Sequence, residues 1–423
     1  MRPTLSHIFL NGEELVMNKN VCFKLRNSLS SLFLGILISM SAACDVETDL
    51  LECNAENYCI SEDGESSCEA GYEWLNPDEL KDYRCVEIPP SPVPQFGTRT
   101  LRKFKEVASF LQGLNTPRDL DFNPHVEGQL WVVNRSDDST LIIDNATSDA
   151  PVFDFRRDSN ASHFMEEVSS ISFASDFNNF ATCQESRNAM NNTMNPDDFM
   201  GPALWSADLN IYAAVNQNSW VLLGSHLDML HQSPLCMGIE HERENAYWVT
   251  DGNSGDIVRY DFVVDHGPGY DDHSDGIVRR YNDFTYTRVP DVPSHLALDK
   301  DTNWLYIADT GGSRIMRLDI TSGMKFETLI PQNEPLQEYS VYKGTTFEVF
   351  AEGLDQPSGI ALTKDHVIVS LFGTSELVAF DYEGNEIDRI ETVAKGLSGI
   401  TIDPNEELWF VDQAEDILFH LVP

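Results

Sequence analysis

One pattern of short strands recurs along most of the chain, between residues 98 and 423. Each copy opens with an alternating apolar segment, and an apolar strand that ends mostly in Asp or Asn follows about ten residues later. A polar turn and another strand complete the unit. The copies begin at Thr116, Ser169, Ser233, Val292, Gln356 and Leu397. Strands rich in β-branched and aromatic residues at such a spacing are typical of β-propellers, so the sequence predicts an all-β fold with six blades.

The repeat also predicts how the ring of blades closes. Outer strands that rise into Gly-Leu occur at residues 347–354 and 388–397, and residues 104–114 end in the same way. The last copy supplies only three strands before residue 423. We therefore expect the strand at about residues 102–111 to become the fourth strand of the last blade, which hides both sheet edges.

These copies resemble the NHL-repeat propellers over roughly residues 98–423. The resemblance implies that the strands of each blade run from a central channel outward. It also implies that the connections between blades, and the loops between second and third strands, lie on one face, which is usually the binding face. The loops between first and second strands, and between third and fourth strands, then lie on the opposite face.

Residues 1–43 are predicted to be a signal peptide. The apolar run at residues 31–40 follows Lys24 and Arg26, and it is too short to span a bilayer comfortably. The small residues before Cys44 resemble a bacterial lipoprotein signal, which implies that Cys44 carries the lipid. Ordinary cleavage near Ala43 is the alternative. We expect an exported protein, either anchored to a membrane by lipid at the periplasm or cell surface, or secreted.

Residues 44–86 are predicted to form a small disulfide module, because so short an exported segment cannot build a sufficient core alone. Its four cysteines are Cys53, Cys59, Cys68 and Cys85. The segment from Cys68 to Tyr72 resembles the Cys-x-x-Gly-Tyr turn of EGF-like modules, which have six cysteines where this segment has four. A zinc site is the alternative. Residues 87–97 are rich in Pro and predict a semi-rigid linker.

Two further cysteines, Cys183 and Cys236, fall near the same face of neighbouring blades. In an oxidising compartment they are candidates for a disulfide, with two free thiols as the alternative.

The chain carries 28 Lys and Arg against 69 Asp and Glu, a formal net charge of −41. Such a surface repels phosphate backbones, so the composition excludes nucleic acid as a partner. It also disfavours anionic membrane surfaces, which leaves an N-terminal lipid as the membrane contact. So acidic a surface favours the binding of cations. We expect a monomer.

Histidines and carboxylates gather where the repeat places the channel mouth on the predicted binding face. Neutral imidazole is the commonest metal ligand, so a zinc site is one interpretation and a wet polar channel is the other. The candidate ligands are His226, Asp228, His231, His295 and Asp251. Candidates for contact with a substrate on the same face are Arg118, Glu167, Arg187 and Asp309.

The segment from His231 to Pro234 resembles a zinc-ligand segment of the peptidylglycine amidating lyase propellers. The resemblance implies a second ligand just after Pro293, but His295 stands one residue later than in that family. A third ligand is expected near Pro357, where Ser358 follows. These departures put the lyase activity in doubt.

A second metal interpretation concerns residues 265–276, an acidic segment between the third and fourth strands of the third blade. Hard oxygen ligands suit calcium, although the spacing of an EF-hand is missing. A plain acidic loop on the face opposite the channel mouth is the alternative. The candidate ligands are Asp265, Asp271, Asp272 and Asp275.

These patterns favour a binding or interaction scaffold that holds a protein or small-molecule ligand on the propeller face. The alternative is a metal-dependent hydrolase or lyase that uses His231 and His295 at the channel mouth. Fold alone does not decide between them, because propellers host both roles.

Overall fold

The computed structural model describes residues 91–97, 102–187, 200–270, 272–330 and 334–422 in full. Between residues 1 and 90 it describes the backbone of seven strands. The predicted signal run and Cys44 lie outside the described residues, as do the side chains of Cys53, Cys59, Cys68 and Cys85. The signal peptide, the lipid anchor and the disulfide module therefore stay predictions.

The early strands form three small sheets. In the first unit of the chain, residues 1–51, β1 (Ser6–Leu10) pairs with β2 (Glu13–Met17). A three-stranded sheet contains β3 (Leu50–Cys53), β4 (Tyr58–Ser61) and β5 (Ser66–Cys68), and a two-stranded one pairs β6 (Tyr72–Trp74) with β7 (Cys85–Glu87).

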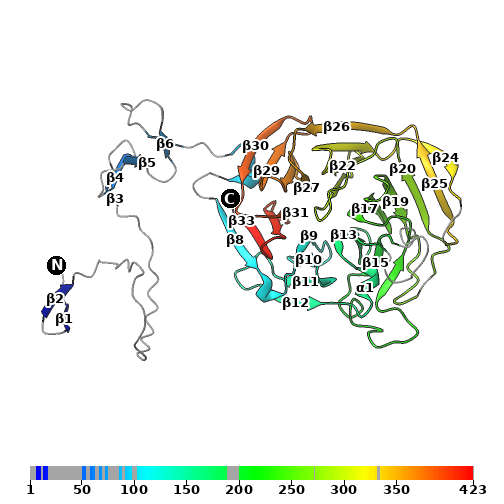
Figure 1. The fold of residues 1–423 in the computed structure, drawn as a ribbon, viewed down its shortest axis with the longest axis horizontal. Coiled ribbons are helices and arrows are strands. Elements are labelled where there is room, and N and C mark those ends of the chain that lie inside the picture. The colour runs from blue at the N-terminus through cyan, green and yellow to red at the C-terminus, as the bar shows by residue number, and fades with distance from the viewer. Residues whose placement is uncertain are drawn as a thin grey trace. The chain divides into compact units, whose positions relative to one another are not determined.

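Six sheets, each with at least four strands, form a ring, and this confirms the predicted six-bladed propeller (Figure 1). Blade one contains β9 (Pro117–Phe122), β10 (Leu130–Asn134), β11 (Ser139–Asp144) and β12 (Val152–Arg156). Blade two contains β13 (Val168–Phe173), β14 (Asn179–Gln184), β15 (Ala203–Ser206) and β16 (His226–Met229). Blade three contains β17 (Cys236–Arg243), β18 (Ala246–Asp251), β19 (Ile257–Asp261) and β20 (Ile277–Tyr281).

The second half of the ring follows the same order from the channel outward. Blade four contains β21 (Leu296–Asp299), β22 (Trp304–Asp309), β23 (Arg314–Asp319) and β26 (Thr346–Glu352). Blade five contains β27 (Pro357–Leu362), β28 (Val367–Leu371), β29 (Glu376–Phe380) and β30 (Glu386–Glu391). Blade six contains β31 (Leu397–Ile402), β32 (Leu408–Asp412), β33 (Ile417–Val422) and β8 (Lys103–Ala108).

The predicted closure of the ring is confirmed. Strand β8 pairs antiparallel with β33, so the first strand of the propeller domain completes the last blade. The pairing joins Lys103 to Val422 and Ala108 to Leu418. Because the two ends of the domain share one sheet, β8 covers the outer edge of β33.

One addition to the ring was not predicted. Strands β24 (Met324–Thr328) and β25 (Glu338–Lys343) lie in the connection between the last two strands of blade four. They extend blade three instead, because β25 pairs parallel with β20 at its outer edge. The short helices are η1 (Pro94–Phe96), η2 (Phe110–Gln112) and α1 (Ala161–Phe164). Among the described residues, no helix combines the length and the apolar character needed to cross a membrane.

The core lies between neighbouring blades. Every residue of β10, β18, β28 and β32 is buried, because blades cover both faces of these strands. This explains why the repeat reads as continuous apolar runs rather than as alternation. Trp131 of blade one, for example, makes edge-to-face contacts with Phe173 and Phe180 of blade two.

The predicted disulfide between Cys183 and Cys236 is confirmed. Their Cα atoms lie 5.4 Å apart, within the ordinary range for a disulfide. Cys183 belongs to β14 and Cys236 begins β17, so the bond joins blade two to blade three near the channel.

The Asp or Asn that ends the second strand of most copies has a structural role. In blade four, Asp309 accepts hydrogen bonds from the backbone nitrogens of Thr287 and Gly312, at 2.7 and 3.2 Å, and from Nε of Arg314 at 2.8 Å. In blade six, Asp412 accepts from the backbone nitrogens of Lys395 and Gly396 in the same way. The carboxylate thus holds the connection that arrives from the preceding blade.

We expect Asp309→Ala to lower the free energy of unfolding by about 2–3 kcal/mol, because two backbone donors and Arg314 lose a buried acceptor. Asp309→Asn keeps one acceptor oxygen and costs about half as much. Urea unfolding followed by circular dichroism measures both values. A loss no larger than that of Glu352→Ala, a variant at an exposed carboxylate of the same blade, would show that the repeated carboxylate has no such role.

Candidate functional site

The first strands of all six blades line a central cavity of about 210 Å³. Its carboxylates all come from blades one to three, which also contribute the apolar side chains of Leu120, Ile171 and Ile239. Blades one and three contribute the carboxylates of Asp119, Asp121 and Glu240. Blades four, five and six contribute an apolar half that contains Leu296, Ala297, Leu298, Ile360, Ala361, Leu362, Ile400 and Ile402.

The carboxylate of Asp119 is held across the channel. Its Oδ2 accepts from Oγ of Ser170 at 2.6 Å and from the backbone nitrogen of Ile171 at 3.0 Å, both in blade two. Its Oδ1 lies 3.5 Å from Nδ1 of His295, which arrives from blade four. Burial raises the pKa of Asp119, and the charge of His295 opposes that rise. Nε2 of His295 lies 3.1 Å from the carbonyl of Ser169.

The other two channel carboxylates have raised pKa values. Asp121 and Glu240 keep some surface toward the cavity but are enclosed by protein, and this burial disfavours their charged forms. Burial raises the pKa of Asp121 to about 7. Burial and the neighbouring charge of Asp121 raise the pKa of Glu240 to about 8, while Lys300 opposes the rise. Both carboxylates would gain from a positive charge placed between them.

The channel mouth on the upper face, the face that carries the connections between blades, is covered by a loop. Asp291 belongs to the connection between blades three and four, yet its carbonyl accepts from Arg118 of blade one and from Nε2 of Gln413 of blade six at 2.9 Å. Its backbone nitrogen donates to Oε1 of Glu185, next to blade two, at 3.0 Å. A residue that contacts three other blades must cross the mouth.

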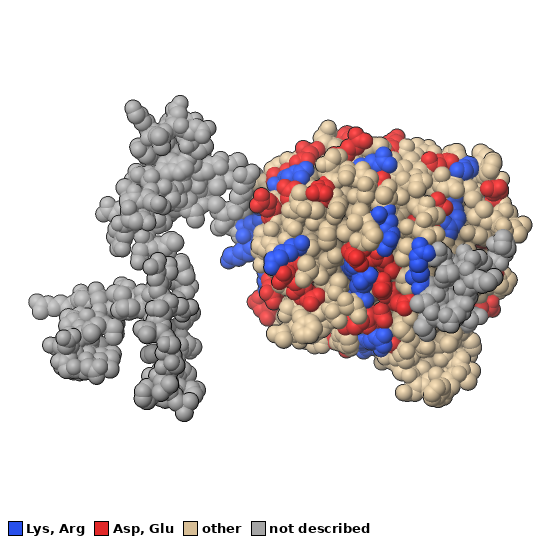
Figure 2. Space-filling model, viewed as in Figure 1, with Lys and Arg blue, Asp and Glu red and all other residues tan. Residues whose placement is uncertain are grey.

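A buried ion network lies under this loop. The carboxylate of Glu185, with 1% of its side chain exposed, lies 3.7 Å from Arg118 and from Arg135 and also pairs with Arg288. Burial lowers the pKa of Arg118 to about 10, and the charge of Glu185 opposes that fall. Acidic and basic side chains gather over the middle of the ring on the face drawn in Figure 2.

On the lower face, opposite the covered mouth, a groove adjoins the channel. Leu298 and Leu362 line both the channel and a groove of about 720 Å³ between blades four and five. The groove is also lined by Trp304, over which Arg317 lies at 4.5 Å, and by Tyr382. At the channel end, Nζ of Lys300 lies 2.9 Å from Nδ1 of His241.

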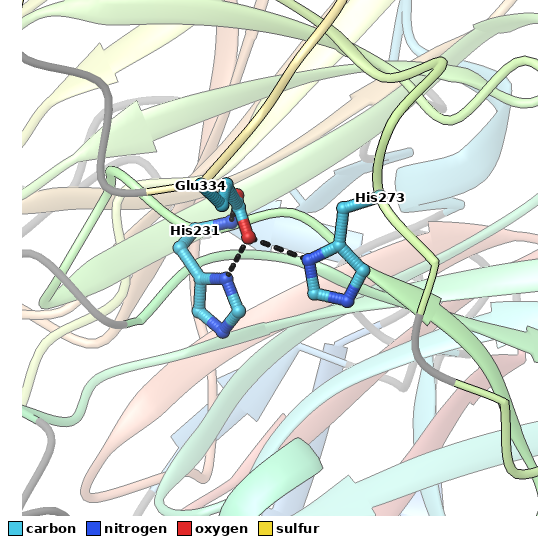
Figure 3. A group of neighbouring side chains, drawn as sticks. All are labelled: His231, His273 and Glu334. Carbon is cyan, nitrogen blue, oxygen red and sulfur yellow. Dashed lines mark hydrogen bonds and ion pairs between the residues drawn. The ribbon is translucent and has the colours of Figure 1, made fainter.

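A separate cluster lies at the outer rim of blades two and three. Oε2 of Glu334 is 2.7 Å from Nδ1 of His231 and 2.5 Å from Nδ1 of His273, so one carboxylate oxygen joins two imidazoles (Figure 3). Oε1 of Glu334 accepts from the backbone nitrogen of His231 at 3.0 Å. Burial alone would raise the pKa of Glu334, but the two histidines lower it to about 2.

The rim cluster corrects two expectations about position. His231 does not meet His295 at the channel mouth, because its contacts are Glu334 and His273 at the rim. The acidic segment 265–276 does not lie on a face remote from His231 either, since its own His273 reaches that residue. The cause is sheet twist, which turns the outer strands until they run around the ring, as β20 and β26 do in Figure 1.

Other predicted site residues have local partners. Arg118 and Glu167 belong to the covered upper mouth, where Glu167 pairs with Arg135 at 2.8 Å. Nδ1 of His226 lies 2.7 Å from the carbonyl of Leu223, and its ring stacks on Phe164. Asp251 pairs with Arg280 at 2.8 Å, Asp309 caps its connection as described, and Arg187 donates to Asn253 at 3.0 Å.

The acidic segment contributes little beyond His273. Asp265 and Asp272 are exposed and accept from the backbone nitrogens of Gly267 and Ser274. Asp275 lies 2.9 Å from His266. Asp271 lies outside the described residues. Among the described residues these carboxylates do not converge on one point within the segment, so the calcium interpretation gains no support there.

Sequence reasoning missed six site residues: Asp119, Asp121, Glu240, Glu185, His273 and Glu334. The first three had a usable signal, because the first strand of each blade lines the channel and acidic side chains are unusual in so enclosed a strand. Asp119 and Asp121 lie in β9, and Glu240 lies in β17. Glu185 and Glu334 had none, because both lie in connections that the repeat does not share.

Known proteins that resemble this chain are found among solved structures. No family model and no curated protein sequence match this chain. A calcium-binding protein, regucalcin from Agrobacterium tumefaciens, is 15% identical over 75% of this chain and 93% of its own, with a TM-score of 0.43. Streptogramin B lyase is 12% identical over 76% of this chain and 97% of its own, with a TM-score of 0.44. An auxiliary nutrient binding protein from Bacteroides thetaiotaomicron is 10% identical over 87% of this chain and 83% of its own, with a TM-score of 0.47.

Proposed function

We propose that this protein is a ligand-binding propeller that takes a small organic cation with an apolar tail into its central channel from the lower face. The observation that carries the proposal is the divided channel wall. The buried carboxylate of Asp119 and the partly buried carboxylates of Asp121 and Glu240 face apolar side chains of blades four to six. A ligand ammonium would relieve the cost of charging these carboxylates, and an alkyl tail would cover the apolar half.

The arrangement favours an organic cation over a chelated metal ion in the channel. A metal ion needs several ligand atoms around one point, about 2.0–2.6 Å from the ion. Among the described residues, the two groups of three side chains close enough for this do not include Asp119, Asp121 or Glu240. A longer ligand can reach these carboxylates one after another along the channel.

Export completes the proposal. A signal peptide over residues 1–43 and a lipid on Cys44 would place the propeller outside the cytoplasm, on a Pro-rich linker at residues 87–97. The disulfide between Cys183 and Cys236 supports an oxidising compartment, since cytosolic thiols stay reduced. In this setting the protein is a tethered binding scaffold for small ligands. The alternative of a hydrolase or lyase required His231 and His295 in one site, and their contacts lie apart.

Calorimetric titration with hexylammonium chloride tests the proposal. We expect a dissociation constant on the order of 0.1–1 mM, weak because the probe is small. Asp121→Asn combined with Glu240→Gln should weaken binding at least about tenfold, since the ammonium loses two countercharges. Binding should strengthen from pH 6 to pH 8, as the carboxylates with raised pKa values ionise.

The matched control is Asp149→Asn combined with Glu352→Gln, two exposed carboxylates outside the channel. Equal binding by both double variants would contradict the proposal, as would failure of the unaltered protein to bind hexylammonium. Calcium chloride serves as a second probe. Calcium binding that the channel variants abolish, without hexylammonium binding, would instead assign the channel to a metal ion.

A further inference from the structure

Three segments that are distant in sequence meet at the rim cluster. His231 comes from the connection between blades two and three, and His273 from the loop before β20. Glu334 comes from the loop before β25. The two rings lie 5.2 Å apart at their centroids and are tilted by 33°. All three side chains are largely buried, with exposed fractions of 5%, 9% and 11%.

The donor set and its spacing suit a divalent transition metal. Imidazole nitrogen and carboxylate oxygen are the ligands that zinc takes from His and Glu, at about 2.0–2.2 Å. One ligand atom from each residue lies within 4.8 Å of the others. Two ligands of a tetrahedral ion lie about 3.3 Å apart, which follows from those bond lengths. The contacts of Glu334 with His273 and His231, now 2.5 and 2.7 Å, must therefore lengthen to about this distance, which small side-chain rotations can supply.

Asp228 supplies an independent observation beside this group. It is 1% exposed, its Oδ1 lies 3.9 Å from Nε2 of His273, and its Oδ2 has no hydrogen-bond partner among the described residues. A histidine that binds a metal through one nitrogen usually donates its other N–H to a carboxylate, which fixes the ring. Asp228 lies on the Nε2 side of His273 with its Oδ1, which also accepts from the backbone nitrogen of Met229 at 2.7 Å, while its buried Oδ2 is left for a further donor.

We infer that His231, His273 and Glu334 bind one zinc ion at the outer rim, through Nδ1 of each histidine and the Glu334 carboxylate, with Asp228 as the positioning residue for His273. The site is distinct from the channel and does not depend on its ligand. Zinc there joins the connection after blade two, which contains His231, to the loop that contains His273 and to the loop that contains Glu334. Its role is to fasten β25 to the edge of blade three, because Glu334 lies four residues before that strand.

Equilibrium dialysis of the full chain tests the inference, after treatment with EDTA and readdition of zinc chloride. We expect one zinc per chain with submicromolar affinity, and a rise of several degrees in melting temperature on loading. His273→Ala and Glu334→Gln should each weaken zinc binding more than about 100-fold, and Asp228→Asn by about 10–100-fold. Cobalt chloride gives a second readout, since a tetrahedral site colours the ion and the variants should lose that absorption.

Two controls keep the result specific. His366→Ala removes a histidine outside the cluster and should change nothing. Glu407→Gln alters the second group of three, Asp403, Glu407 and His420, which could also attract zinc. Circular dichroism confirms that each variant is folded. Absence of bound zinc, retention of zinc by His273→Ala, or its loss in Glu407→Gln instead would each overturn the inference.

Discussion

Replacing Glu185 with Ala is expected to lower the free energy of unfolding by about 3–5 kcal/mol, the cost of leaving a buried charge without its partner. Glu185 has 1% of its side chain exposed and faces Arg118, which is equally buried, together with Arg135 and Arg288. It also accepts from the backbone nitrogen of Asp291. The substitution therefore removes one buried carboxylate from three guanidinium groups and one backbone donor, and Arg118 and Arg135 keep only their contacts with Asp291, Gln413 and Glu167.

Urea unfolding at pH 7 measures this loss. Glu185→Gln keeps the shape and two hydrogen-bonding positions but removes the charge, so it should cost clearly less than the Ala variant and still more than 1 kcal/mol. The control is Glu415→Ala, because the pair of Glu415 and Lys395 is exposed and such pairs contribute about 0–1 kcal/mol. Similar losses for Glu185→Ala and Glu415→Ala would show that the loop over the upper mouth does not depend on the ion network.

The second large effect is the pH dependence of stability caused by the channel carboxylates. Asp121 has a pKa of about 7 in the folded protein against 3.8 for an ordinary Asp. Between these pH values the folded state holds a proton that the unfolded state has released, so stability falls as pH rises from about 4 to 7. For Glu240 the same fall extends to about pH 8.

Asp121→Asn combined with Glu240→Gln removes both charges and should flatten this slope. At pH 8 we expect the double variant to be more stable than the unaltered protein by about 2–4 kcal/mol. Each unit of pKa shift corresponds to about 1.4 kcal/mol, and hydration of the carboxylates from the channel reduces the total. At pH 4 the two proteins should have nearly the same stability. Urea unfolding from pH 4 to pH 8 measures the difference. An equal slope in both proteins would mean that these carboxylates titrate normally.

Much of the fold could be predicted because a propeller repeats one local pattern. The six copies and the closing strand β8 follow from the order and spacing of strands. The same spacing placed Cys183 near Cys236 and left open whether they form a disulfide, which the structure shows. Strands β24 and β25 could not be predicted in place, because they arise in one connection of blade four and pair with another blade. Nothing in their local sequence specifies that partner.

The site was harder to predict than the fold for physical reasons. The assignment of each loop to one of two faces is valid near the channel, where the strands run along the channel axis. It fails at the rim, because sheet twist turns the outer strands until they run around the ring. His231 and His273 were therefore placed on opposite faces, although one carboxylate oxygen of Glu334 joins them. Asp251 was predicted as a metal ligand and Asp309 as a substrate contact, but a carboxylate that recurs at the end of the second strand in most blades indicates structure before function.

Carbon-13 resonance titration of the Asp and Glu side-chain carboxyls, with and without hexylammonium, tests the central claim most directly. In the free protein we expect Asp121 to titrate near pH 7 and Glu240 near pH 8. A bound ammonium should lower each pKa by about one unit or more, because it stabilises the charged carboxylates. Ordinary pKa values near 4 in the free protein, or raised values that the ligand leaves unchanged, would contradict a cation-binding channel.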